Sequence, residues 1–337
     1  MAQLPRPSRA ARLAAAVATA AALAVLGAGP AVSAVGDPTV TDPRFLAHFT
    51  GQGQTPENIA LEPDGSADIT FAFAHQVARV AKNGDTTVLA ELPAVANPNT
   101  PVGAAIALGI ARAHDGTLYV AYATGEASTH GIWRIAPGGR TAERLVALPV
   151  DTFPNGMAID KECDTLYVAD SSRGAVWSVA LNTGDPAPKA TVWASGDALE
   201  PTPQLPFGAN GLKVHNGAVW VSNTAQGSLL RIPFGPGPDR AAGPVEKRAT
   251  GLGAIDDFAF TGHGDTVLAA LIQANALELV RPDGSHTTVL TAADGLDNPT
   301  SVAVHAKTVY VNSAAYFNTA PDRDPNLLLA RISKNKL

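Results

Sequence analysis

The stretch Ala209-Asn210-Gly211-Leu212-Lys213-Val214 is followed by His215-Asn216-Gly217 and then by Ala218-Val219-Trp220-Val221-Ser222-Asn223. Two short runs of mainly apolar residues, the second rich in β-branched and aromatic side chains, therefore flank an Asn-Gly pair. That is the pattern of a β-hairpin with a tight turn. The stretch predicts a strand, a turn and a second strand, with the polar amide of Asn210 just before the first strand.

The same unit recurs along the chain at a nearly constant spacing. The residues that precede the first strand of each copy are separated by 51, 47, 55, 46 and 44 positions. This period is close to that of the four-stranded blades of β-propellers, so six copies predict six blades. The aligned positions are Glu57, Leu108, Asn155, Asn210, Asp256 and Thr300.

The two ends of the repeating region predict how the ring closes. The last copy stops after the strand at 327–332 and leaves no room for a fourth strand. The segment Phe45 to Phe49 lies before the first copy and is the spare strand that completes the last blade. Pairing it there removes an exposed sheet edge. We therefore expect an all-β, six-bladed propeller of four-stranded antiparallel blades, closed by an N-terminal strand.

Residues 1–34 have the pattern of a secretory signal peptide. Three arginines within the first twelve residues precede an apolar run from Leu13 to Ala28, and Val32-Ser33-Ala34 is a small-residue cleavage site. A membrane anchor is the alternative, but glycines and Pro30 interrupt the apolar run short of a span. We expect cleavage after Ala34, a secreted protein without a membrane span after processing, and a propeller domain at 35–337.

Composition excludes several classes of function. The formal net charge is −6 and the basic residues are scattered, which argues against a nucleic-acid partner. Cys163 is the single cysteine, so the chain has no internal disulfide and packing must hold it together. No G-x-S-x-G elbow, Rossmann fingerprint, phosphate loop or zinc spacing occurs. The sequence does not indicate an oligomeric state.

Four of the six aligned positions carry an oxygen-bearing side chain. The loops that lead into the first strands lie on one face of a propeller, at the mouth of its central channel, so these side chains converge there. Carboxylate and amide oxygens without Cys or His suit a hard cation, here Ca²⁺ or another divalent ion. The alternative is that each residue is an ordinary turn former, but four at the same phase favour a metal site. The predicted metal ligands are Glu57, Asn155, Asn210 and Asp256.

The order of these motifs resembles the calcium-dependent six-bladed propeller lactonases, which comprise the gluconolactonase and regucalcin group and, more distantly, the paraoxonases. Pro56-Glu57-Asn58-Ile59-Ala60-Leu61 matches the glutamate-bearing motif of the first blade, and Pro154-Asn155-Gly156-Met157 matches the asparagine motif. Phe207-Gly208-Ala209-Asn210-Gly211-Leu212 and Ile255-Asp256-Asp257-Phe258 are similar to paraoxonase motifs, with Asp257 where an amide is expected. The resemblance implies calcium-dependent hydrolysis of a small-molecule lactone or related ester.

The sequence also departs from that family at three points. Leu108 stands where gluconolactonase-like members offer an asparagine. Asn210 replaces the carboxylate that they place in the fourth blade, although Asp256 in the fifth could restore the charge. The histidine pair expected of paraoxonases is not clearly present.

Hydrolysis also needs a base that takes a proton from the attacking water. Among eight histidines, only His75 and His130 fall in hairpins on the predicted site face, and His130 is the first candidate. Asp170 ends a second strand on the same face and could equally bond local backbone groups. Asp257 follows Asp256 directly and is a possible base, a ligand or a partner of a ligand.

Two other functions stay open at this point. A non-enzymatic propeller would bind a ligand or a protein at the channel mouth, with a structural calcium ion fastening the blades. A propeller that resembles strictosidine synthases would form or rearrange bonds, but the four-residue metal pattern makes it less attractive. The fold alone does not choose among them.

Overall fold

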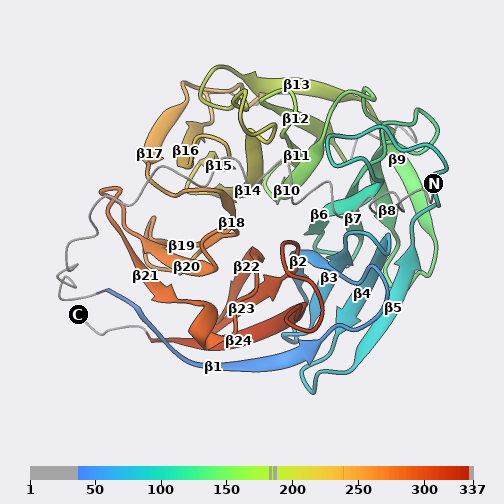
Figure 1. The fold of residues 1–337 in the computed structure, drawn as a ribbon. Helices are drawn as coiled ribbons and strands as arrows, with labels where there is room; N and C mark the ends of the chain where they lie inside the picture. Colours follow the sequence, from blue (N-terminus) through green and yellow to red (C-terminus); the bar gives the residue numbers. More distant parts are fainter. Residues whose placement is uncertain (1–36, 182–183, 185–187, 238, 334–337) are drawn as a thin grey trace, which may run out of the picture.

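A computed structural model describes residues 37–181, 184, 188–237 and 239–333. These residues form six four-stranded antiparallel sheets, arranged as blades around a central axis (Figure 1). The predicted six-bladed propeller is therefore confirmed. The predicted signal peptide at 1–34 lies outside the described residues. No helix in the described ranges is long and apolar enough to cross a membrane.

The first three blades follow one another along the chain, and each has its first strand at the axis. Blade 1 contains β2 (Pro56–Leu61), β3 (Ala67–Phe71), β4 (Gln76–Val80) and β5 (Thr86–Glu91); blade 2 contains β6 (Ile106–Arg112), β7 (Leu118–Ala123), β8 (Gly131–Ile135) and β9 (Ala142–Ala147); blade 3 contains β10 (Pro154–Asp160), β11 (Thr165–Asp170), β12 (Ala175–Ala180) and β13 (Ala190–Ser195).

The next blades repeat the arrangement, and the sixth includes the N-terminal strand. Blade 4 contains β14 (Ala209–His215), β15 (Ala218–Asn223), β16 (Ser228–Pro233) and β17 (Glu246–Ala249); blade 5 contains β18 (Ile255–Phe260), β19 (Val267–Leu271), β20 (Ala276–Val280) and β21 (His286–Leu290); blade 6 contains β22 (Pro299–His305), β23 (Thr308–Ser313), β24 (Asn326–Ser333) and β1 (Thr39–His48). One 3₁₀ helix, η2 (Ala292–Asp294), precedes β22.

Burial along the strands follows their distance from the axis. All residues of β3 and of β15 are buried, because neighbouring blades cover both faces of a second strand. The outer strand β5 is mostly exposed. The predicted Asn-Gly turn joins β14 to β15, and Asn216 and Gly217 both have positive φ, at 46° and 68°, as a type I′ turn requires. The apolar second strand in the predicted hairpin thus reflects its position between two neighbouring blades, which recurs in each blade.

Every first strand contains a β-bulge near its start. In β14, Ala209 pairs with Asn223 and Leu212 with Val221, so β14 holds one extra residue there. The other five first strands show the same kind of register shift. The aligned positions were predicted to precede their strands, but the structure places them inside the strands, at the bulges. The reason is that backbone pairing between the first and second strands already begins at the residue before each bulge.

The bulges also bring neighbouring first strands into close contact around the axis. A Cβ added to Gly109 would lie 2.1 Å from the carbonyl oxygen of Asn155, and one added to Gly156 would lie 2.5 Å from that of Asn210. Only glycine fits such gaps, because real Cβ atoms do not approach backbone atoms so closely. The second bulge position therefore sets how tightly the inner ring packs.

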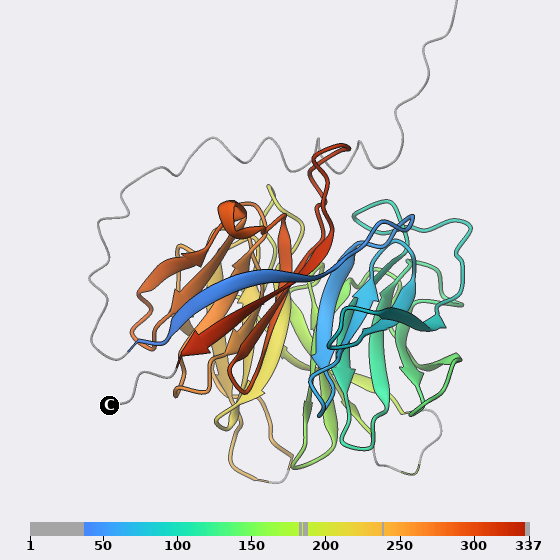
Figure 2. The ribbon, with the colours of Figure 1, turned by 90° about the horizontal axis from the view of Figure 1, so that it is seen from below.

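Blade 6 closes the ring. β1 pairs antiparallel with β24, and the order in that sheet is β1-β24-β23-β22. Figure 2 shows β1 in blue alongside the red strands of the C-terminal part. The predicted closing strand, Phe45 to Phe49, is confirmed in its pairing, although the strand itself runs from Thr39 to His48. Phe49 follows it and packs edge-on against Phe71 of blade 1, with ring centroids 4.9 Å apart.

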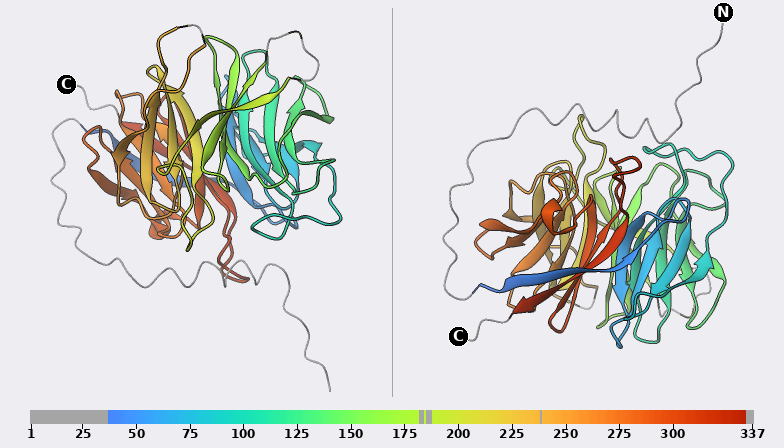
Figure 3. Two further views of the ribbon diagram at one scale, coloured as in Figure 1. Left: turned by 90° about the horizontal axis from the view of Figure 1, so that it is seen from above. Right: turned by 60° about the horizontal axis from the view of Figure 1, so that its bottom comes forward.

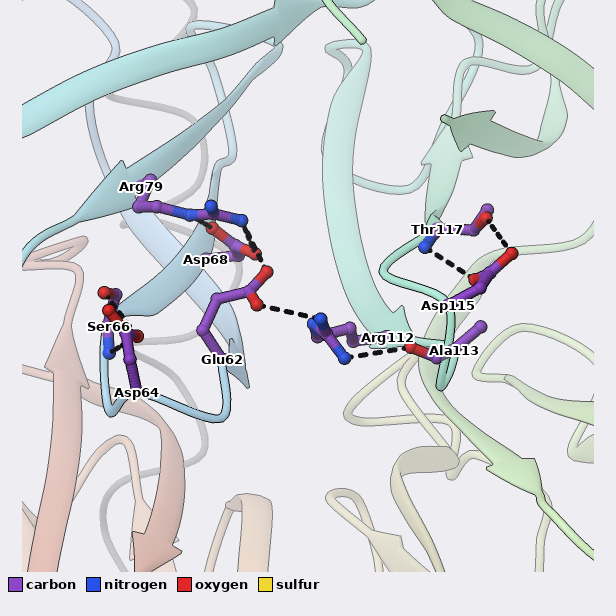
Figure 4. A network of polar contacts seen from close by, with 9 residues as sticks. All are labelled: Glu62, Asp64, Ser66, Asp68, Arg79, Arg112, Ala113, Asp115 and Thr117. Carbon is purple, nitrogen blue, oxygen red and sulfur yellow. Dashed lines mark hydrogen bonds and ion pairs between the residues drawn. The ribbon is translucent and has the colours of Figure 1, made fainter. Parts of the chain in front are cut away.

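A charged network joins blades 1 and 2 at the ends of their first strands. Glu62 follows β2 and lies between two arginines, Arg79 of β4 and Arg112 of β6 (Figure 4). Arg112 Nη2 is 2.9 Å from Glu62 Oε2, and Arg79 Nε donates to buried Asp68 over 2.7 Å. Because these groups lie at the far ends of the first strands, the network is on the opposite face from the bulges.

Replacing Phe49 with alanine should test whether closure depends on this anchor. We expect the free energy of unfolding to fall by about 3 to 5 kcal/mol, because a buried aromatic ring is lost from a packed joint. Phe45→Ala on the same chain segment is the matched control. Its ring is 42% exposed, so the change should cost less than about 1 kcal/mol. Urea unfolding measures both, and equal losses would contradict the anchoring role of Phe49.

Candidate active site at the channel mouth

The four predicted ligand residues meet in one cavity. Glu57, Asn155, Asn210 and Asp256 come from β2, β10, β14 and β18, and all four line a cavity of about 670 Å³, which includes its open mouth. Each is at most 6% exposed. The bulges explain this convergence, since each one turns its first residue toward the same end of the channel. Leu108, at the equivalent position of blade 2, lines the cavity as well.

The two asparagines are held by the same pair of hydrogen bonds in successive blades. Asn155 Nδ2 donates to Ser171 Oγ over 3.3 Å, and Ser171 Oγ donates to Ala209 O over 2.6 Å. Asn210 Nδ2 donates to Thr224 Oγ1 over 2.8 Å, and that hydroxyl donates to a carbonyl of β18 over 2.8 Å. The amide nitrogens are thus anchored to the protein. Within the described ranges, neither Oδ1 accepts a bond from the protein, so both remain available to a ligand.

The two carboxyl groups are buried without a basic partner among the described residues. Burial raises the pKa of Glu57 to about 7. Burial first, and then the negative charges of Glu57 and Asp257, raise the pKa of Asp256 well above its usual value. Asn210 Nδ2 also donates to Asp256 Oδ1 over 2.8 Å. Two buried carboxylates that repel each other are stabilised by a bound cation.

The donor set fits a hard divalent cation on chemical grounds. It combines two carboxylates with two amide oxygens, which are ligands that Ca²⁺ accepts at variable coordination number. The described residues contain no cluster of three or more His, Cys, Asp and Glu side chains that could hold a metal ion. The four side chains offer oxygen atoms as donors, so this set does not suit a metal that requires nitrogen or sulfur ligands.

Asp257 points away from this cavity, although it follows Asp256 directly. It is the second residue of the bulge in β18 and does not line the cavity. Its Oδ1 accepts a hydrogen bond from Lys213 Nζ over 2.6 Å. Burial raises the pKa of Asp257, and Lys213 opposes that rise. Asp257 therefore forms an ion pair with Lys213 and does not line the cavity.

The two candidate histidines lie on the predicted face but are buried between blades. His130 follows β7, and its Nδ1 accepts from the backbone N–H groups of Thr124 and Gly125, both at 3.0 Å. Its Nε2 contacts Thr152 Oγ1 at 2.8 Å. Burial lowers the pKa of His130 to about 4. Both ring nitrogens are occupied, and His130 does not line the cavity.

His75 and Asp170 are also engaged elsewhere. His75 Nε2 lies 3.0 Å from Ala105 O, and burial lowers the pKa of this histidine. Asp170 accepts from the backbone of Phe153 over 2.9 Å and from Trp177 Nε1 over 3.0 Å. Neither residue lines the cavity. The structure thus brings the four predicted ligands together and keeps the four predicted bases outside their cavity.

Tyr316 begins a hairpin, 316–326, that the sequence predicts as a wall of the pocket but to which it assigns no chemistry. It lies in the connection between β23 and β24, which projects from the site face of the ring (Figures 2 and 3). Its hydroxyl donates to Glu57 Oε2, and its ring lines the cavity. Burial and the charge of Glu57 raise the pKa of Tyr316, so the hydroxyl stays protonated. The connection between β23 and β24 is longer than the five other connections between second and third strands, and none of those contains a tyrosine.

Comparison with solved structures shows that other proteins share this fold. The calcium-binding protein regucalcin from Agrobacterium tumefaciens superimposes with a TM-score of 0.64 at 15% identity, over 88% of this chain and 96% of that chain. A gluconolactonase from Xanthomonas campestris gives 0.62 at 16% identity, over 92% and 99%. The PQQ-bound aldose sugar dehydrogenase from Streptomyces coelicolor gives 0.62 at 17% identity, over 88% and 99%.

The sequence itself matches no protein-family model and no curated protein. The similarity to gluconolactonase and regucalcin structures confirms the resemblance at the level of the six-bladed fold. At these identities the fold alone is shared, since propellers with different reactions are among the similar structures.

The buried carboxyl groups should make the metal-free protein less stable as pH rises. The pKa of Glu57 in the folded state lies above its value of 4.5 in the unfolded chain. The stability due to proton uptake is therefore complete below about pH 4.5 and is lost as pH rises through about 7. The shift corresponds to a loss on the order of 3 kcal/mol.

Urea unfolding with chelator at pH 5 and pH 8 measures this loss. Glu57→Gln should reduce the difference between the two pH values, because it removes one of the two buried charges in the cavity while Asp256 continues to contribute. The exposed Glu200→Gln is the control and should keep the wild-type difference. A Glu57→Gln protein with an unchanged pH dependence would show that this carboxyl is not the titrating group.

Proposed function

We propose that the chain is a secreted, metal-dependent hydrolase that acts on a lactone or a related ester. Glu57, Asn155, Asn210 and Asp256 would hold Ca²⁺ or another divalent cation at the floor of the cavity. The observation that supports this most is the convergence of these four side chains, with two anchored amides and two buried carboxylates in one cavity. Secretion rests on the signal-peptide pattern of residues 1–34.

The proposed reaction needs few groups. When bound, the cation would polarise the ester carbonyl and stabilise the negative charge that forms on its oxygen. Water adds to the carbonyl carbon, the bond to the ring or alkoxy oxygen breaks, and that oxygen takes up a proton. The chain excludes bulk water from this step by burying the floor of the cavity.

The proton from the attacking water has two possible acceptors in the described part of the cavity. Tyr316 is held as a donor, so the carboxylates of Glu57 and Asp256 are the groups that can accept. One oxygen of each is already bonded, to Tyr316 and to Asn210 respectively. Each carboxylate thus keeps its second oxygen for the ligand or for the proton. This assignment replaces His130 and the other predicted bases, which do not line the cavity.

Metal removal is the direct test of the proposal. Protein treated with chelator should lose hydrolysis of simple lactones and aryl esters and regain it with added Ca²⁺. Asp256→Ala should weaken Ca²⁺ binding at least about 100-fold, measured by calorimetry, because it removes one of two charged ligands. Asp265→Ala changes an acidic residue of the same blade at the opposite face and should leave binding unchanged.

The possible outcomes separate the two main functions. Unchanged Ca²⁺ affinity in the Asp256→Ala variant would contradict the proposed metal site. Intact Ca²⁺ binding without hydrolysis across the panel would instead support a propeller that only binds its ligand.

Tyr316→Phe should show that the phenol hydroxyl orients Glu57. Losing this bond frees the carboxylate to rotate, so we expect Ca²⁺ affinity to fall about 10-fold while the ring still packs near Phe73. Tyr310→Phe is the matched control, since it removes a buried hydroxyl of the same blade that donates to Gly65 O away from the cavity. Equal Ca²⁺ affinities in the two variants would reject the orienting role.

A further inference from the structure

We propose that the cavity selects an uncharged lactone or ester with an apolar body, and that Leu108 sets this preference. The inference rests on the proposed hydrolytic function and names its substrate class. It excludes sugar lactones, whose rings carry several hydroxyl groups, and substrates that carry a carboxylate or phosphate. Three features of the described cavity support it.

The walls of the cavity are aromatic and aliphatic on nearly every side. Apolar side chains come from first strands, from the loops that lead into them and from the connections between second and third strands. They include Phe73, Ile106, Leu108, Phe153, Phe207 and Phe317. Burying an apolar substituent against such walls favours binding in proportion to the area removed from water. A hydrocarbon chain or an aromatic ring therefore gains affinity along most of the surface above the floor.

The polar side chains of the cavity are already engaged, with one exception. The hydroxyl of Thr224 is held between Asn210 and a carbonyl of β18, and the hydroxyl of Tyr316 is held by Glu57. Apart from the four proposed ligands, only Gln273 among the polar lining side chains makes no hydrogen bond to another described residue. It can pair with one or two hydroxyls of a sugar ring. Each further buried hydroxyl without a partner lowers affinity roughly 5- to 150-fold.

Charge at the cavity disfavours anionic substrates. The lining residues in the described part of the chain include Glu57 and Asp256 but no lysine, arginine or histidine. Lys213 of β14 is bound to Asp257, and neither residue lines the cavity. An anionic substituent away from the proposed cation would meet no opposite charge and would lose its hydration.

Leu108 interrupts the polar ring at the floor. It occupies the first bulge position of β6, where Asn155 and Asn210 occupy the same position of β10 and β14. It is 2% exposed and faces the cavity together with Ile106 of the same strand. At this bulge position, blade 2 therefore presents a hydrocarbon side chain to the substrate, whereas blades 3 and 4 present amides. An apolar substituent should lie toward blade 2.

Two lactones with the same six-membered ring test the preference. δ-Decalactone carries an alkyl chain, and glucono-1,5-lactone carries hydroxyl groups. We expect wild-type kcat/KM to favour δ-decalactone at least 100-fold in the presence of Ca²⁺. Leu108→Asn should narrow this ratio at least 10-fold by supplying an amide at that position. Leu108→Ala is the control: it enlarges the cavity without adding a polar group and should leave glucono-1,5-lactone a poor substrate.

The lactams that correspond to these two lactones allow binding to be measured without turnover, because the amide bond of a lactam ring resists hydrolysis. Calorimetry on wild-type protein with Ca²⁺ should show the alkyl δ-lactam binding at least 100-fold more tightly than gluconolactam. Equal affinities, or tighter binding of gluconolactam, would overturn the substrate class even if hydrolysis is observed. The expected affinities without any hydrolysis would uphold the apolar selectivity and reject the hydrolytic function. If Leu108→Ala and Leu108→Asn narrowed the ratio of kcat/KM values equally, the space at this position, rather than its polarity, would set the preference.

Discussion

The β-bulge at the start of each first strand is the constraint on which the channel depends. A regular strand would direct successive side chains to opposite faces, and only one residue per blade could approach the axis from that end. The extra residue instead places two successive side chains near the axis at different depths. In blade 5 these are Asp256, at the floor of the cavity, and Asp257, beneath it with Lys213. One backbone irregularity thus separates the side chains that line the cavity from the ion pair that lies under it.

The inner ring balances close packing against buried charge. Glycine at the second bulge position of blades 2, 3 and 4 lets the first strands approach each other, so the ring is narrow there. A narrow ring excludes water, and this raises the pKa of Glu57 and Asp256. Hydroxyls such as Ser171 and Thr224 satisfy the polar backbone between blades and orient the amides at the same time. Packing and ligand geometry therefore arise from the same few contacts.

Much of this structure could be predicted from the repeat. The Asn216-Gly217 turn, the six blades and the closing strand follow from local turn chemistry and from the spacing of equivalent residues. The convergence of Glu57 with Asn155 could be predicted for the same reason, since equal phase in a ring means equal position at the axis. Topology also placed His75 and His130 on the correct face.

Topology could not give the depth at which a side chain lies. His130 turns into the joint between blades, where backbone N–H groups take its Nδ1, and Asp170 accepts bonds from the backbone around it. The contact of Tyr316 with Glu57 could not be predicted, because it lies in the longest of the connections between second and third strands and the others contain no tyrosine. Local hydrogen bonds fix the positions of these side chains. Such bonds leave no periodic pattern in the sequence.

Ring closure has a consequence for how the protein acquires its structure. β1 and β24 stand at opposite ends of the described chain, so their pairing brings together residues as far apart as Thr39 and Ser333. Such contacts cost much loop-closure entropy, which makes folding slow. The sixth sheet cannot form until β24 has been synthesised, so β1 has no partner strand while the residues of blades 1 to 5 are being made. Blades 1 to 5 can assemble in order during synthesis, but the ring can close only once β24 is available to pair with β1.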